Sequence, residues 1–136
     1  MAEMIDLVAK RGIADKFHFP GFMRGKQVQE MLAMSDVYIM PSVSEPFGIS
    51  PLEAMQVGCP SIISHQSGCA EILQHAIKTD YWDIDAMADA IYAIVKYPAM
   101  YKSLHELGMA EVNNIKWSDA GLKVRRIYDG VINHTL

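Results

Sequence analysis

The stretch from Asp36 to Ser42, DVYIMPS, restricts how this chain can fold more than any other part of the sequence. Its apolar residues follow one another without alternation and stop at Pro41. A strand that is apolar on both faces is buried on both faces, which is typical of a parallel sheet covered by helices. Parallel neighbours need long crossover connections, usually helical, so this stretch predicts an α/β fold.

Other short apolar runs fit the same sheet. They lie near Phe17–Phe19, Ile62–Ser64 and Ala76–Thr79, and amphipathic helical patterns separate and follow them. The length of 136 residues favours one domain. Sheets usually hold about five strands, so the small number predicts a parallel sheet, flanked by helices, that lacks an edge strand or its first strand.

The composition excludes several classes of function. A formal net charge of −4 gives no general attraction for nucleic acid or an anionic membrane. No apolar run approaches the ~20 residues of a membrane helix, and the N-terminus does not resemble a secretory signal. We therefore predict a cytoplasmic protein with free thiols and no metal, because no zinc or ligand-pair spacing is formed by Cys59 and Cys69 or by the histidines His18, His65, His75, His105 and His134.

The loop that follows DVYIMPS carries the strongest functional pattern. SEPFGISPLE, from Ser44 to Glu53, leads from a strand end into a predicted helix. Ser50 is a typical N-cap, Pro51 suits the first helical position, and Glu53 completes a capping box with Ser50. Ligands of open α/β sheets bind at the carboxyl ends of the strands, where this loop lies.

Such a helix start suits a ligand that carries phosphates and hydroxyls. The backbone amides from Gly48 to Ser50 would take phosphate oxygens, and Gly48 would let the ligand approach closely because it has no Cβ. Glu45 and Glu53 could accept hydrogen bonds from hydroxyl groups. The residues alone leave a second interpretation open, in which Glu53 only caps the helix and Glu45 is a solvated loop charge.

A close resemblance to one enzyme family is carried by SDVYIMPSVSEPFGISPLEAMQVGCPSIIS, followed by SGCAEIL. This stretch resembles the C-terminal half of retaining nucleotide-sugar glycosyltransferases with two facing Rossmann-like domains. The core of the motif is two glutamates, here Glu45 and Glu53, separated by seven residues, with Pro-Phe-Gly after the first. The resemblance extends from about Leu7 to Tyr128.

The resemblance implies a role for each matching residue at the sugar and phosphate end. Glu45 would hold the hydroxyls of the donor sugar as the catalytic carboxylate. The backbone amides of Phe47, Gly48 and Ile49 would meet the sugar and the diphosphate. Ile49 and Ser50 would lie along the donor, with Ser50 near the phosphates.

At the nucleoside end, the resemblance implies that Glu53 accepts both ribose hydroxyls and that Phe22 and Met23 lie near the base. It also implies that the donor is a nucleotide diphosphate sugar and that no cofactor or metal is needed.

The sequence lacks two parts of the family pattern. The strand that carries a Gly-rich turn with an Arg and a Lys would precede Met1, and so would an N-terminal acceptor domain. Residues 1–136 are therefore expected to be a partial C-terminal nucleotide-sugar-binding domain, inactive as an isolated chain. The missing domain would bind the acceptor and make any peripheral membrane contact.

Three other interpretations stay open. A non-catalytic flavodoxin-like module would share the fold and the phosphate site. A nucleotide-sugar epimerase or a phosphorylase would share the two-domain architecture, although nothing in the sequence marks a pyridoxal-phosphate lysine. His65 and Glu71 are marginal candidates, because each lies close to the same strand ends.

Overall fold

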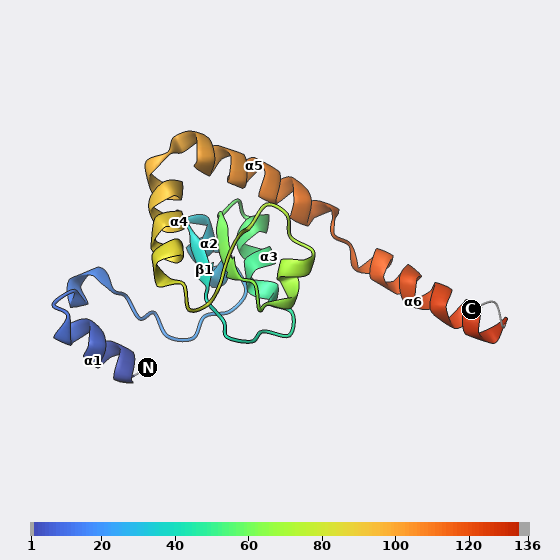
Figure 1. Cartoon of the computed structure of the whole chain (residues 1–136), viewed down its shortest axis with the longest axis horizontal. Helices are drawn as coiled ribbons and strands as arrows, with labels where there is room; N and C mark the ends of the chain where they lie inside the picture. The colour runs from blue at the N-terminus through green and yellow to red at the C-terminus, as the bar shows by residue number, and fades with distance from the viewer. Residues whose placement is uncertain (1, 134–136) are drawn as a thin grey trace.

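The computed structural model describes residues 2–133, so the expectations for Met1 and His134 lie outside it. Helices and short strands alternate along the chain (Figure 1). In chain order the elements are α1 (Ala2–Lys10), η1 (Ala14–Lys16), α2 (Lys26–Ala33), β1 (Tyr38–Met40), α3 (Ile49–Gln56), β2 (Ser61–Ser64), η2 (Gly68–Glu71), β3 (Ile77–Thr79), α4 (Ile84–Lys96), α5 (Pro98–Asn114) and α6 (Trp117–Ile132).

The three strands form one parallel sheet in the order β1-β2-β3. Tyr38 pairs with Ser61, and Ile62 pairs with Ile77. All four residues of β2 are buried, as expected for the central strand of a covered parallel sheet. The α/β class and the strands predicted around residues 37–40, 62–64 and 76–79 are confirmed.

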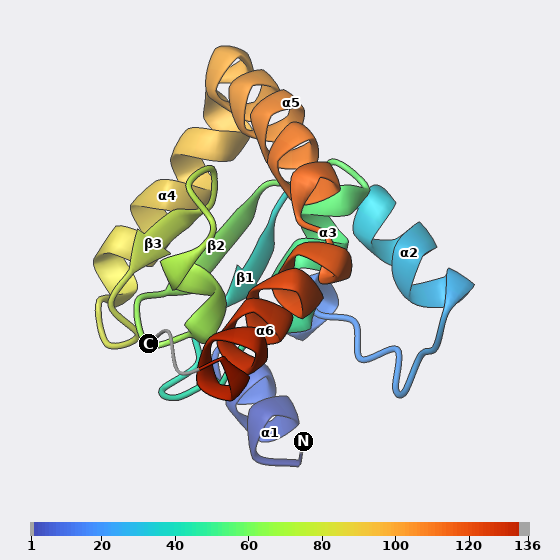
Figure 2. The same cartoon turned by 90° about the vertical axis from the view of Figure 1, so that its right-hand side faces the viewer.

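Helices hold the sheet from several sides (Figure 2). α3 packs against β1 and β2, α4 packs against β2 and β3, and α5 lies across α3 and α4. A buried hydrophobic cluster joins β1, β2, α3, α5, η2 and the segment after η2. It consists of Met40, Met55, Ile63, Cys69, Leu73, Ala76 and Val112. This cluster lies directly beneath the loop that precedes α3.

The strand predicted at Phe17–Phe19 is wrong. The segment is irregular, and its two phenylalanines are 45% and 41% exposed. Their rings stack on each other with centroids 6.3 Å apart. A strand exists only where a neighbour completes its hydrogen bonds, and within residues 2–133 the sheet pairs β1 only with β2.

The two end helices project from the body in different directions (Figure 1). Within α1 only Val8 is buried, and within α6 no residue is buried. The apolar side chains of α6 are exposed, among them Trp117 at 83%, Tyr128 at 64% and Ile132 at 73%. In the part of the chain that the structure describes, no helix has the length and hydrophobicity needed to cross a membrane.

Candidate functional site

The loop between β1 and α3 holds Glu45 at the carboxyl end of the sheet. Glu45 is half-buried and forms an isolated parallel bridge with Ser67, which follows β2. Its carboxylate turns back along its own loop and accepts a long hydrogen bond of 3.4 Å from the Phe47 amide. One of the amides expected to meet the sugar is therefore held by the carboxylate expected to bind the sugar hydroxyls.

Gly48 is the N-cap of α3 and has a left-handed backbone with φ of +86°. A Cβ at this position would lie 2.9 Å from Met40 Cε, 3.2 Å from Glu45 Cγ and 3.3 Å from Cys69 Sγ. These atoms belong to the protein interior and to the base of the loop. The glycine is therefore required by the turn and by packing behind the loop.

The prediction that Ser50 caps the helix is wrong. α3 begins at Ile49 after the left-handed Gly48, and no side chain caps it. The Ser50 hydroxyl instead accepts a hydrogen bond of 2.7 Å from the Tyr38 hydroxyl and lies 3.9 Å from Met40 Sδ. Burial raises the pKa of Tyr38; the hydrogen bond with Ser50 opposes this increase, and the charges of Cys69, Glu45 and Glu53 each add a smaller one. Tyr38 therefore stays protonated at neutral pH.

The start of α3 presents unpaired backbone donors. Among the hydrogen bonds recorded for residues 2–133, none involves the amide of Gly48, Ile49 or Ser50. The first amides of a helix have no partner within the helix and carry its positive end. This terminus can therefore bind an anionic group.

Glu53 lies on the outer face of α3 and is exposed. It shares that face with Ile49 and Gln56, at helical spacing. The predicted capping box is wrong, because the helix has already started before Ser50 and the Glu53 carboxylate makes no cap hydrogen bond. Its carboxylate is therefore available to an external ligand.

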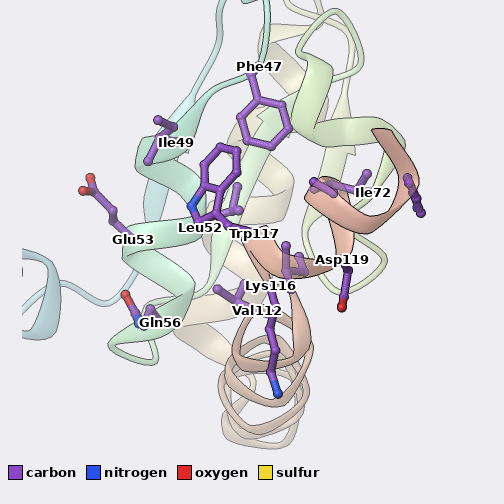
Figure 3. Close-up of a pocket in the computed structure, with 13 residues that line it drawn as sticks. Phe47, Ile49, Leu52, Glu53, Gln56, Ile72, Val112, Lys116, Trp117 and Asp119 are labelled. Atoms are coloured by element: carbon purple, nitrogen blue, oxygen red, sulfur yellow. The ribbon is translucent and has the colours of Figure 1, made fainter. Parts of the chain in front are cut away.

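A cavity of about 740 Å³ opens beside this face (Figure 3). Its walls come from the loop before α3, from α3, from the residue after η2, and from the junction of α5 with α6. They consist of Phe47, Ile49, Leu52, Glu53, Gln56, Ile72, Val112, Ile115, Lys116, Trp117, Asp119, Ala120 and Lys123. The volume is in the range of small-molecule pockets.

The structure gathers the predicted site residues into two adjoining groups. Phe47, Ile49 and Glu53 line the cavity. Glu45, Gly48 and Ser50 do not line it; they belong to the loop and the helix start at the sheet end.

Phe22 and Met23 lie apart from these two groups, on the irregular segment before α2, and do not line the cavity. Phe22 is 81% exposed, with the Arg24 guanidinium 4.9 Å from its ring centroid.

The α6 side of the cavity was not predicted from the sequence. Lys116, Trp117, Asp119 and Lys123 place two basic groups, an indole and a carboxylate on that wall. The amphipathic period of this helix was visible, but a period does not tell which part of the molecule a helix start adjoins. Within residues 2–133 no group of three or more His, Cys, Asp or Glu side chains has a metal-binding arrangement.

Comparison with known proteins gives consistent matches. Residues 2–110 match the family described as glycosyl transferases group 1. An uncharacterized glycosyltransferase from Methanocaldococcus jannaschii is 40% identical over 72 residues, which is 53% of this chain and 18% of the relative. N-acetyl-alpha-D-glucosaminyl L-malate synthase from Bacillus anthracis is 33% identical over 107 residues, 76% of this chain and 27% of the relative.

A solved structure gives the same result for the fold. Sucrose-phosphate synthase from Thermosynechococcus elongatus superposes with a TM-score of 0.82 at 25% identity, and the match covers 98% of this chain and 35% of that one. The chain therefore spans only 18% to 35% of the length of these relatives. Its parallel α/β sheet, its matched residues and its structural neighbour agree: the chain belongs to the glycosyl transferases group 1 family.

Proposed function

We propose that this chain is the donor-binding part of a retaining glycosyltransferase and that it holds a nucleotide diphosphate sugar at the start of α3. One observation carries the proposal. The amides of Gly48, Ile49 and Ser50 make no hydrogen bond within the described chain. They lie between Glu45, whose carboxylate accepts a long hydrogen bond from the Phe47 amide, and the exposed Glu53.

The diphosphate binds at these amides. The helix terminus supplies N–H donors and a positive partial charge, which attract the phosphate oxygens and stabilise the leaving diphosphate. The Ser50 hydroxyl is already engaged with Tyr38, so Ser50 contributes its backbone amide rather than its side chain.

The sugar lies toward Glu45. Its hydroxyls donate to the Glu45 carboxylate and replace the 3.4 Å hydrogen bond from the Phe47 amide. That exchange frees the Phe47 amide to donate to the sugar. The carboxylate and the amide of one loop then bind the same ligand.

The nucleoside lies on the other side of the phosphates. Glu53, exposed on α3 beside the cavity, accepts the two ribose hydroxyls. Phe22 and Met23 lie near the base. Phe22 is 81% exposed and neither residue lines the cavity, so base binding requires their segment to approach the site.

In the whole protein, the reaction is transfer of a hexose from the nucleotide diphosphate to a hydroxyl of a glycan, lipid or other acceptor, with retained anomeric configuration. Positioning and stabilisation of the leaving group supply the catalysis, without a metal or a cofactor. The acceptor binds mainly to a separate N-terminal domain in the cytoplasmic enzyme, so residues 1–136 alone bind donor weakly and do not turn it over.

Titration of the ¹⁵N-labelled chain tests the donor site. UDP, GDP and ADP, each with its glucose conjugate, are added while amide resonances are followed. We expect the largest shifts at residues 45–53 with at least one base. The donor-site proposal is wrong if saturating concentrations of all six ligands leave these resonances unmoved.

Inactivity of the isolated chain is tested separately, by incubating it with the three sugar conjugates and a mixture of hydroxyl acceptors. Clear release of nucleoside diphosphate above the rate without protein would contradict that part of the proposal and leave the binding site standing.

A further inference from the structure

Two strand-end loops are joined backbone to backbone at the proposed sugar site. The turn after β2 donates from the Gly68 amide to the Glu45 carbonyl at 2.9 Å and from the Cys69 amide to the Phe47 carbonyl at 2.6 Å. In the opposite direction the Glu45 amide lies 3.4 Å from the Gln66 carbonyl. Both ends of the Glu45–Phe47 segment are therefore attached to one turn.

That turn is itself firmly held. Ser67 is 2% exposed, and its hydroxyl donates to the Ser64 carbonyl at 2.7 Å. The Ser64 hydroxyl, at the end of β2, donates to the Ser42 carbonyl at 2.6 Å. Cys69 is fully buried. The turn is a fixed support because its hydrogen bonds lead back to the central strand and its side chains are packed in the core.

Gly68 leaves no room for a side chain on the side facing the Glu45 loop. A Cβ there would overlap the Pro46 carbonyl oxygen and lie 3.0 Å from the Phe47 Cα. Both are backbone atoms, so a side chain at residue 68 can be accommodated only if the loop moves. Gly108 differs, because a Cβ there meets the flexible end of Met55 at 3.1 Å.

We propose that Gly68 is a positioning residue for the sugar end of the donor site, acting through the backbone of Glu45 and Phe47. This inference rests on the donor site proposed above. Glu53 is placed differently, since it stands on α3, which is anchored in the core by Ala54 and Met55. Displacement of the loop should therefore weaken the contacts to the sugar more than the contacts to the ribose.

The experiment compares Gly68→Ala with the wild-type chain and with Gly108→Ala, in which a buried glycine of α5 gains a Cβ that meets the Met55 side chain and not the loop backbone. Calorimetric titration gives the Kd of each nucleoside diphosphate and the Kd of its glucose conjugate. The ratio of the two Kd values measures the gain in affinity that the sugar provides. In Gly68→Ala we expect the gain from the sugar to fall by about tenfold, the loss of one hydrogen bond to a charged group. The Kd of the bare diphosphate should stay within about threefold, because its contacts come from α3. Gly108→Ala should keep the wild-type ratio.

Two results would overturn the positioning role. One is an unchanged ratio in Gly68→Ala. The other is an equal loss for the bare diphosphate and the conjugate, which would indicate a general structural role. If Gly68→Ala does not fold, Ser67→Ala loosens the same turn without overlap, and the same change in the ratio is expected of it.

Amide hydrogen exchange without ligand separates this inference from the proposed function. The Gly68 and Cys69 amides should be protected in the wild-type chain, and the Gly68→Ala change should expose them. Absence of any nucleotide binding by the wild-type chain would reject the donor site and the positioning role together. Binding by the wild type with an unaltered ratio in the variant would reject the positioning role alone.

Discussion

The carboxylate of Glu111 on α5 binds His75 twice, accepting a hydrogen bond of 2.9 Å from its backbone amide and lying 3.1 Å from its ring Nδ1. The other carboxylate oxygen accepts a hydrogen bond of 2.7 Å from the Gln74 amide. The Glu111 side chain is only 13% exposed. One side chain thus ties the turn before β3 to the helix that crosses α3 and α4.

Replacing Glu111 with Ala should lower the free energy of unfolding by about 2–3 kcal/mol, because two backbone amides lose a charged acceptor. Urea unfolding followed by circular dichroism measures it. Glu106→Ala on the same helix is the control, since Glu106 is 61% exposed and lies 3.8 Å from Lys102; its effect should stay within about 0.5 kcal/mol. Equal effects of the two changes would show that the Glu111 contacts contribute nothing measurable.

Gly58→Ala should destabilise the chain by more than about 2 kcal/mol, through backbone strain and overpacking together. Gly58 ends α3 with φ of +85°, and a Cβ would overlap the His105 ring, whose Nδ1 lies 2.7 Å from the Gly58 carbonyl. Gly12→Ala is the matched control, because Gly12 has φ of +68° but open space around a Cβ. It should cost only about 1 kcal/mol. If both substitutions lowered the free energy of unfolding equally, the contact between the new Cβ and His105 would not contribute to the destabilisation.

The thiol of Cys59 should make the free energy of unfolding fall as the pH rises from 9 to 11. Burial raises the pKa of Cys59 from 9.0 to about 11, with a smaller increase from the charge of Asp36. In this range the unfolded chain loses the thiol proton while the folded chain keeps it, so unfolding becomes easier by up to about 3 kcal/mol. Below pH 9 the effect is absent.

The measurement for Cys59 is the slope of unfolding free energy against pH. Cys59→Ala should flatten that slope between pH 9 and 11, because the variant lacks the buried thiol. Parallel slopes for the variant and the wild type would contradict the raised pKa.

Removing α6 should leave the body folded. A chain that ends at Lys116 loses a helix with no buried residue. Its free energy of unfolding, measured by urea denaturation, should therefore differ from that of the full chain by less than about 1 kcal/mol. The cavity beside Glu53 would lose the wall formed by Trp117, Asp119 and Lys123. Loss of cooperative unfolding in the shortened chain would show that α6 supports the fold.

Substitutions of the two glutamates of the motif should affect different ligands. Glu53→Gln should weaken bare nucleoside diphosphates and their sugar conjugates alike, by roughly tenfold or more, because the ribose is common to both. Glu45→Gln should weaken only the conjugates. Calorimetric titration measures both, with Glu106→Gln as a remote control. A loss of bare diphosphate binding in Glu45→Gln would refute the assignment of Glu45 to the sugar.

Structural features that depend on a short continuous stretch of sequence could be predicted. The strands at residues 37–40 and 62–64 follow from apolar runs closed by turn residues, and Asp83 caps α4 as its type indicates, accepting a hydrogen bond of 2.9 Å from the Ala86 amide. Features that depend on a distant partner could not be predicted. Phe17–Phe19 has strand composition but no neighbour to pair with.

The same limit applies within the site. Ser50 is a residue type typical of an N-cap, but Gly48 adopts a left-handed conformation and the helix starts two residues earlier than predicted, at Ile49. The Ser50 hydroxyl instead accepts a hydrogen bond from Tyr38 in the sheet. Trp117 lines the cavity because α5 ends beside it and α6 begins there. The seven-residue spacing of the glutamates was visible in the sequence; the side of α3 on which a cavity opens was not.

The order of the strands has a consequence for how quickly the sheet can form. The sheet follows chain order, so each pairing closes a short loop: Tyr38 and Ser61 are 23 positions apart, and Ile62 and Ile77 are 15 apart. The difference in closure entropy between these loops is only about 0.4 kcal/mol. Chain length therefore favours neither pairing strongly, although parallel pairings across crossovers of this length form more slowly than local helical contacts. We expect side-chain packing around the fully buried strand β2 to decide which pair of strands meets first.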